Sequence, residues 1–229
     1  MKQIQNFGDQ RQTWFCVYCG GPTETRDHIP SKVLLDEPYP TNLPIVPACQ
    51  KCNAAFSLDE EYLACLLDCV LTGSVDADEY KRPKINRILN AKPALVSKLF
   101  QARQDAAVNT SFNVEMDRVR NVVLKLARGH AAFELNEPQL DEPSNISFVP
   151  FPEMCLDVKV RFEAPPRSAI SPEVGSRAMY RLVLDEPGSS TWNIAQTGRY
   201  RYLASVGSAI VIRIVMSEYL ACEVAWDYI

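Results

Sequence analysis

Apolar residues recur at helical spacing in two stretches of this chain of 229 residues. Leu58 to Leu71 forms the first stretch, and the preceding run Ser57 to Glu60 (SLDE) has the form of a capping box, so we predict a helix that ends at Gly73. The second stretch extends from about Glu79 to Glu134, with interruptions near Pro83 and Pro93. It predicts a middle region made of several helices.

The pattern changes after a segment that is rich in proline. Leu135 to Ser147 contains Pro138 and Pro143, and it predicts a linker or a domain boundary. Four apolar or alternating runs with many β-branched and aromatic residues follow, and they predict antiparallel strands in a small β domain. The runs are Met154 to Phe162, Met179 to Leu184, Trp192 to Leu203 and Ala209 to Trp226.

Glycine and proline divide the first 58 residues into short pieces. These breaks include Gly20, Gly21, Pro22, Pro30, Pro38 and Pro40. They predict turns and short strands gathered around something other than a large core. A bound metal would supply that centre.

Cysteine spacing predicts a metal site in this region. Met1 to Thr13 is polar and lacks the apolar run of a signal peptide, so we expect a cytoplasmic protein, in which disulfides are rare. Cys16 and Cys19 form one C-x-x-C pair, and Cys49 and Cys52 form another. The two pairs predict a tetrahedral zinc site; the alternative is four buried cysteines without metal. Four thiolates saturate zinc, so the ion would be structural and would hold no reacting water.

The remaining cysteines and one of the two histidines receive simpler interpretations. We expect Cys65 and Cys69 on the first helix, and Cys155 and Cys222 in strands, to be small core residues. We expect His130 to lie on a helix surface.

Three further motifs accompany the cysteine pairs. Asp27-His28-Ile-Pro and Asn42-Leu lie between the pairs, and Asn53 follows Cys52 directly. The order C-x-x-C, D-H-I-P, N-L, C-x-x-C-N resembles the HNH endonuclease family over about a quarter of the chain. The resemblance implies a ββα-metal fold with a zinc-bound frame.

The resemblance also implies a role for each residue between the pairs. His28 would be the general base, Asp27 would bind a catalytic divalent cation, Asn53 would be a second ligand, and Asn42 would hold the His28 loop in place. Mg²⁺ or Mn²⁺ suits such oxygen ligands, and hydrolysis of a phosphodiester needs both a base and a hard cation. Neighbouring strand residues point to opposite faces, so Asp27 and His28 reach one ion only if the backbone turns, a bend that Pro30 suits. Otherwise His28 faces the water while Asp27 reaches the ion from the end of the strand.

The chain departs from the family pattern at three points. Asn53 stands where many members have histidine, which is a common variant. No glycine pair precedes Asn42, and Ala-Ala-Phe-Ser follows Asn53 where a lysine-glycine ending is usual. The last two departures remove flexible or basic groups that often meet the phosphate backbone.

Charge is unevenly distributed along the chain. The formal net charge is -4, yet residues 81–130 carry eleven basic and three acidic side chains. This stretch is either a set of solvated helix faces or a footprint for backbone phosphates. Arg26, Lys32 and Lys51 are the candidate nucleic-acid contacts near the motifs, although Arg26 could equally be solvated.

Aromatic and arginine residues are frequent in the C-terminal region. Trp192, Gln196, the run from Gly198 to Tyr202 and the run from Ser217 to Val224 could stack on nucleic acid or engage a protein partner. The favoured interpretation is a strand core with ordinary cross-strand pairs.

Together these patterns predict an α+β protein. Residues 1–72 would form a ββα-metal HNH module with a zinc site of four cysteines, residues 73–135 a helical region, and residues 148–229 a small antiparallel β domain. The expected activity is metal-dependent hydrolysis of phosphodiester bonds in DNA, with RNA second, and the resemblance to the HNH family implies products with 5′ phosphates. One alternative is a non-catalytic zinc module that binds nucleic acid or protein. Another is a nuclease subunit that a partner, such as a defence-system ATPase, activates through the β domain. No membrane partner is expected.

Overall fold

The computed structural model describes residues 13–76, 82–105, 110–166, 171–184 and 192–228. Most of Met1 to Thr13, and the expected start of the helical region at Glu79, lie outside these ranges. The described chain mixes helices with a five-stranded antiparallel sheet, which is an α+β fold. No helix in these ranges is long and apolar enough to cross a membrane.

Two short strands and a short helix follow one another in the N-terminal part. Strand β1 (Thr25–His28) pairs antiparallel with β2 (Ile45–Ala48), and helix α1 (Gln50–Ala55) begins directly after Cys49. A 3-10 turn, η2 (Lys32–Leu34), lies in the connection between the strands. The order strand, strand, helix is the one that a ββα element requires.

Helix α2 (Ser57–Thr72) confirms the first predicted helix, which ends at Gly73 with φ 69°. The left-handed backbone at this C-terminus favours glycine. The predicted capping box is wrong, because Ser57 is already inside the helix and Phe56 before it has a helical backbone and no side-chain cap. Helix α1 runs into Phe56 without an extended residue, so Ser57 has no N-cap position to fill.

The middle region contains the predicted helices and one unexpected hairpin. Helices α3 (Pro83–Ala91) and α4 (Pro93–Ala102) each carry proline in the first turn, where its missing N–H costs nothing. Helix α5 (Met116–His130) continues into a π-helical turn, η4 (Ala131–Leu135). Strands β3 (Arg103–Asp105) and β4 (Thr110–Phe112) are too short to produce a visible period in the sequence.

The C-terminal sheet has the order β5-β9-β8-β7-β6. The runs from Trp192 and from Ala209 are confirmed as strand-forming regions, and each contains two strands. The bounds are β6 (Asn193–Gln196), β7 (Tyr200–Val206), β8 (Ala209–Met216) and β9 (Leu220–Asp227). Strand β5 (Asn145–Pro150) begins inside the segment predicted to be a linker, because its edge position beside β9 tolerates a polar and proline-containing sequence.

Two predicted strands are helices. Met154 to Phe162 lies mostly in α6 (Leu156–Glu163), which follows the 3-10 turn η5 (Phe151–Glu153). Arg213 Nη1 donates to the carbonyls of Phe162 and Ala164 at 2.8 and 2.6 Å, so a side chain from the sheet satisfies the C-terminal end of α6.

The second misassigned segment, Met179 to Leu184, lies in α7 (Arg177–Leu184). Arg177 and Arg181 are four residues apart, and both approach Glu134. Side chains at this spacing are neighbours on one face of a helix, about 6 Å apart, whereas a strand would separate them by about 13 Å. The helix therefore lets the Glu134 carboxylate contact both arginines. Glu134 is distant in the sequence, so the pattern of the segment itself does not reveal this contact.

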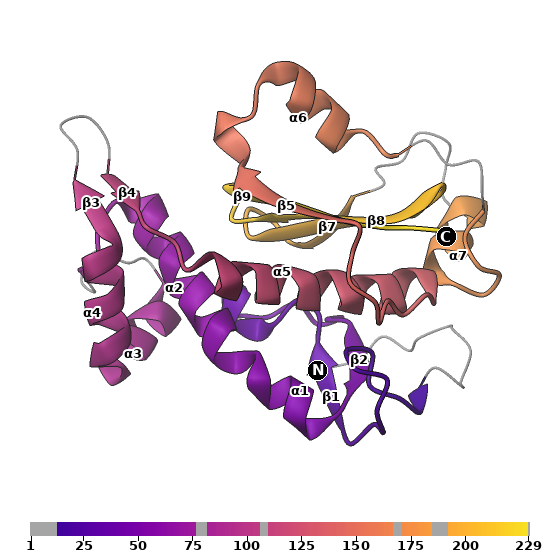
Figure 1. Cartoon of the computed structure of the whole chain (residues 1–229), viewed down its shortest axis with the longest axis horizontal. Helices are drawn as coiled ribbons and strands as arrows, with labels where there is room; N and C mark the ends of the chain where they lie inside the picture. Colours follow the sequence, from indigo (N-terminus) through magenta and orange to yellow (C-terminus); the bar gives the residue numbers. More distant parts are fainter. Residues whose placement is uncertain (1–12, 77–81, 106–109, 167–170, 185–191, 229) are drawn as a thin grey trace.

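The main apolar core contains residues from all three segments predicted from the sequence, 1–72, 73–135 and 148–229. It includes Leu63 of α2, Leu126 of α5 and Ile212 of β8, each fully buried. Helix α5 packs between α2 and one face of the sheet, and α6 lies over the other face (Figure 1). The N-terminal strands therefore lie against α5 and its continuation η4, where Ile29 and Phe133 share a smaller core.

Candidate metal centre and its surroundings

Four cysteines meet at one end of the N-terminal strands. The Sγ atoms of Cys16, Cys19, Cys49 and Cys52 all lie within 4.8 Å of one another, and those of Cys19 and Cys49 are 3.8 Å apart. A tetrahedral zinc with bonds of about 2.3 Å would separate its sulfurs by about 3.8 Å. The four thiols can therefore hold a metal ion, and their spacing and chemistry fit zinc.

Backbone turns place these cysteines. Gly20 has φ 73°, and its N–H donates to the Cys16 carbonyl at 2.8 Å, which closes a tight turn around the first pair. Cys49 caps α1, and its sulfur accepts from the N–H of Cys52 at 3.3 Å. This backbone donor lowers the pKa of Cys49 to about 7, which favours the thiolate that a metal binds.

His28 ends strand β1 and pairs with Ile45 of β2. Its side chain is half-buried, and it has no hydrogen bond among the described residues. Burial lowers the pKa of His28, the nearby cations Lys32 and Lys125 lower it further, and Asp27 opposes them. The imidazole therefore favours its neutral form, in which a ring nitrogen can accept a proton.

Asp27 points into the protein. Its Oδ2 accepts from the hydroxyl of Tyr18 at 2.8 Å and lies 2.7 Å from Nζ of Lys125. The Lys125 ammonium also contacts Glu60, and it donates to Ser31 at 2.8 Å. Two buried carboxylates thus share one buried cation. Strand alternation directs Asp27 and His28 to opposite faces of β1.

Asp27 and Asn53 are the expected ligands of a catalytic cation. Each uses one polar side-chain atom for contacts within the fold. Asn53 Nδ2 donates to Thr25 Oγ1 at 3.2 Å and to the Arg26 carbonyl at 3.4 Å. Thr25 shares a face of β1 with Asp27, so Asn53 and Asp27 lie on the same side of the strand. Neither Oδ1 of Asn53 nor Oδ1 of Asp27 takes part in the hydrogen bonds of the described chain. These two oxygens suit a hard cation, although the Asp27 carboxylate already forms an ion pair with Lys125.

Asn42 lies in the loop before β2 and is exposed. None of the hydrogen bonds within the described ranges joins its side chain to the His28 loop. The backbone makes the connection instead, because the Ile29 N–H donates to the Pro44 carbonyl at 2.9 Å. Asn42 lines a cavity with residues of the sheet and η4.

The basic side chains have two different environments. Arg26, Lys32 and Lys51 are exposed near the strands and α1. In the basic stretch 81–130, however, Arg82 and Lys125 are buried in ion pairs, and Arg118 pairs with Asp59 at 2.6 Å. Much of this positive charge is therefore used within the fold.

His130 is completely buried, so its expected surface position is wrong. Its Nε2 lies 2.8 Å from the Tyr200 hydroxyl, and its ring stacks on Tyr202 with centroids 3.7 Å apart. The sheet covers this side of α5, which the helical pattern alone does not reveal. Burial holds the pKa of His130 well below its ordinary value.

The four cysteines outside the cluster differ in burial. Cys65, Cys69 and Cys222 are buried, which confirms them as core residues. Cys155 is exposed before α6, so its predicted place in a strand is wrong. The expected strand around it is the helix described above.

The C-terminal arginines and aromatic residues contact one another within the fold. Arg201 lies between Glu163 and Glu218, at 2.8 and 2.9 Å, and its guanidinium is 4.5 Å from the Trp192 ring centroid. Trp192 Nε1 donates to the Glu163 carbonyl at 2.9 Å. These contacts attach α6 to the sheet.

Lys125, Glu60 and Tyr18 surround Asp27, and the sequence patterns did not single them out as site residues. A signal for Lys125 exists, because it is a charged residue next to the apolar positions Val122 and Leu126 of α5. Its carboxylate partners are distant in sequence and give no such signal.

Comparisons with protein families, with curated proteins and with solved structures found no match. Function is therefore inferred from the residues and their geometry.

Proposed function

We propose that this protein is a metal-dependent endonuclease of the HNH type, with a structural zinc ion on the four cysteines. The observation that carries the proposal is the position of His28, at the end of β1 in a strand-strand-helix unit that also contains the cysteine cluster. The His28 imidazole is half-buried and makes no hydrogen bond with the described residues, so it suits a general base.

The proposed chemistry assigns each side chain a task. His28 takes a proton from the attacking water, while Asp27 and Asn53 would hold Mg²⁺ or Mn²⁺. When bound, the cation neutralises charge on the phosphate and on the leaving oxygen. Arg26, Lys32 and Lys51 are exposed near this unit and would attract the nucleic-acid backbone. DNA is the first proposed substrate and RNA the second, with cleavage in the cytoplasm.

The ion pair between Lys125 and Asp27 limits how strongly a cation can bind. A divalent ion on the free Asp27 oxygen would lie close to the ammonium group, and the two like charges would repel. We therefore expect weak cation binding and cleavage that requires a high cation concentration.

The same ion pair favours a second candidate function. If Lys125 alone serves as the cation of Asp27, the unit is a non-catalytic zinc module that binds nucleic acid or protein. A nuclease subunit that a protein partner activates through the C-terminal sheet remains a third proposal.

A nicking assay tests the assignment of His28. Supercoiled plasmid is incubated with Mg²⁺ or Mn²⁺ and with either the wild type or His28→Ala, after both proteins are shown to hold equal zinc. We expect the wild type to nick the plasmid and His28→Ala to lose at least about a hundredfold in rate. Equal nicking by the two proteins would refute the role of His28. A wild type that binds nucleic acid but cleaves neither DNA nor RNA would favour the binding module.

A further inference from the structure

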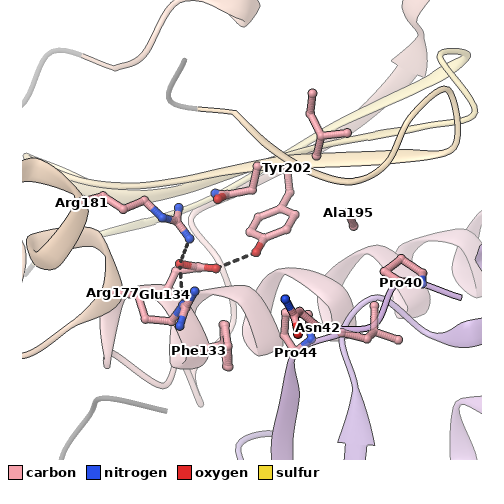
Figure 2. A pocket seen from close by; sticks show the side chains of 12 residues that line it. Pro40, Asn42, Pro44, Phe133, Glu134, Arg177, Arg181, Ala195 and Tyr202 are labelled. Carbon is pink, nitrogen blue, oxygen red and sulfur yellow. Dashed lines mark hydrogen bonds and ion pairs between the residues drawn. The ribbon is translucent and has the colours of Figure 1, made fainter. Parts of the chain in front are cut away.

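A cavity of about 240 Å³ lies where the three predicted segments meet. Figure 2 shows Asn42 on its lower side, Glu134 of η4 on the left and Tyr202 of β7 on the upper side. Asn42 is exposed, and Ile194 of the edge strand β6, which also lines the cavity, is 64% exposed, so solvent reaches the cavity. The four clustered cysteines and His28 are not among its lining residues.

The π-helical turn η4 brings two of the lining residues to the cavity. Phe133 and Glu134 lie in this turn, which follows α5 directly. The turn ends at Asn136, whose left-handed backbone with φ 59° is uncommon for a residue other than glycine. π-helical turns are rare in proteins and frequent at functional sites. An unfavourable local conformation at a cavity therefore points to a function of that cavity.

The carboxylate of Glu134 already has partners within the fold. Glu134 is 1% exposed, accepts a hydrogen bond from the Tyr202 hydroxyl at 2.5 Å and lies 2.7 Å from Nη2 of Arg181. A buried carboxylate with such partners does not require a cation from outside the protein. A ligand of the cavity therefore does not need to bring a charge.

Two amide side chains are available to an uncharged ligand. Asn42 lines the cavity from the loop before β2 and Asn193 lines it from β6, and neither side-chain amide makes a hydrogen bond with the described residues. Each amide carries two donor hydrogens beside an acceptor oxygen. An asparagine amide uses this arrangement to pair with a neighbouring donor and acceptor on the edge of a base, such as N6 and N7 of adenine.

Other lining side chains suit the flat faces of a ring. Pro40, Pro44 and Ile194 offer apolar surface. Arg181, whose side chain is 32% exposed, offers a planar guanidinium group. Bases stack on guanidinium planes and between apolar side chains. Sites that enclose a whole drug-sized ligand measure roughly 300 to 1,000 Å³, so this smaller cavity suits a single ring system.

A planar ring with hydrogen-bonding groups along its edge is the chemistry of a nucleobase. We propose that this cavity binds one base, presented either by a free nucleoside or by an unpaired nucleotide of a nucleic-acid strand. The proposal goes beyond the proposed cleavage reaction and does not depend on it, because His28, Asp27 and Asn53 do not line the cavity.

Calorimetric titration of the full chain without added Mg²⁺ or Mn²⁺ tests the proposal. The first probes are adenosine, guanosine, cytidine and uridine, with ribose as the control that lacks a base. The second probes are a duplex with one bulged nucleotide and the same duplex with an abasic residue at the bulge. A bulged nucleotide is already unpaired, so turning its base out of the stack costs little.

We expect the base to strengthen binding at least about tenfold in one or both comparisons. A difference between a nucleoside and ribose identifies a free nucleoside as a ligand. A difference between the bulged and the abasic duplex identifies a base within a strand. Equal binding with and without the base in both comparisons would overturn the proposal.

Two matched variants locate the base. Asn193→Leu should weaken the tightest probe at least about tenfold, because leucine has a similar size and no hydrogen-bonding group. Asn145→Leu should leave the affinity unchanged, since this exposed asparagine lies on β5 at the opposite edge of the same sheet. If Asn193→Leu does not fold, Asn42→Ala in the exposed loop provides the same test. Unchanged affinity in the folded variant would overturn the proposal.

His28→Ala separates this inference from the proposed cleavage. It should bind the base as tightly as the wild type, because His28 does not line the cavity. A wild type that binds the base but nicks no plasmid would count against the endonuclease and still support the base site. Loss of base binding in a folded His28→Ala protein would overturn the placement of the base in this cavity.

Discussion

Nζ of Lys125 lies 2.7 Å from Oδ2 of Asp27, and both side chains are at least nine-tenths buried. The contact joins the middle of α5 to the strand that ends at His28. It therefore affects both the stability of the N-terminal unit and the chemistry available at Asp27.

Removal of the Lys125 charge should destabilise the protein strongly. Lys125→Met leaves the buried carboxylates of Asp27 and Glu60 without a counter-ion, and loss of one partner of a buried ion pair costs about 3–5 kcal/mol. Urea unfolding measures the free energy. Lys159→Met is the control, since this lysine lies on α6 and is only half-buried. A loss below about 1 kcal/mol in Lys125→Met would contradict the importance of the pair.

The same substitution should strengthen cation binding if Asp27 is a metal ligand. Without the ammonium group, Mn²⁺ no longer meets a like charge at the carboxylate, and its affinity should rise about tenfold, which corresponds to about 1.4 kcal/mol. Electron paramagnetic resonance of free Mn²⁺ measures the affinity in folded samples. The double variant Lys125→Met with Asp27→Asn should lose the gain; if it retains the gain, the ion binds at another place.

Metal analysis should find one zinc ion per chain. Cys49→Ser removes one of four sulfurs, so we expect it to lose most of the zinc and to unfold at a lower temperature. Cys155→Ser is the matched control, because this cysteine is exposed and lies outside the cluster. Full zinc occupancy in Cys49→Ser would mean that the ion is not held as proposed.

His130 should make folding less favourable in acid. Burial lowers the pKa of His130 in the folded protein below its ordinary value of 6.5, so the unfolded chain takes up a proton first as the pH falls. Its contribution to stability is complete above about pH 6.5, and it decreases below that by up to about 1.4 kcal/mol per pH unit.

The free energy of unfolding of the wild type and of His130→Gln, measured between pH 8 and 5, isolates this effect. Glutamine does not titrate, and it can still hydrogen-bond to Tyr200. The variant should therefore lose less stability than the wild type over the acid part of this range. Parallel pH curves would show that His130 is not the group responsible.

Local patterns in the sequence were sufficient for several parts of this structure. The helix that ends at Gly73, the helices near Pro83 and Pro93, and the strand character of the two last runs follow from spacing and from residue preferences that operate within a few residues. The cysteine cluster also follows from local spacing, because each C-x-x-C pair brings two sulfurs together on one turn.

Four features depend on tertiary contacts that the sequence pattern did not reveal. Segments α6 and α7 are helices, His130 is buried, and Asp27 pairs with a lysine. Arg213 satisfies the end of α6, Glu134 draws together the arginines of α7, and the sheet covers His130. The local sequence around Asp27 does not show whether its partner is a metal ion or a lysine. The lysine comes from α5, which is distant from Asp27 in the sequence. The physical reason is that periodicity records which face of a segment is apolar, whereas a buried charge or a helix end depends on the group that packs against it.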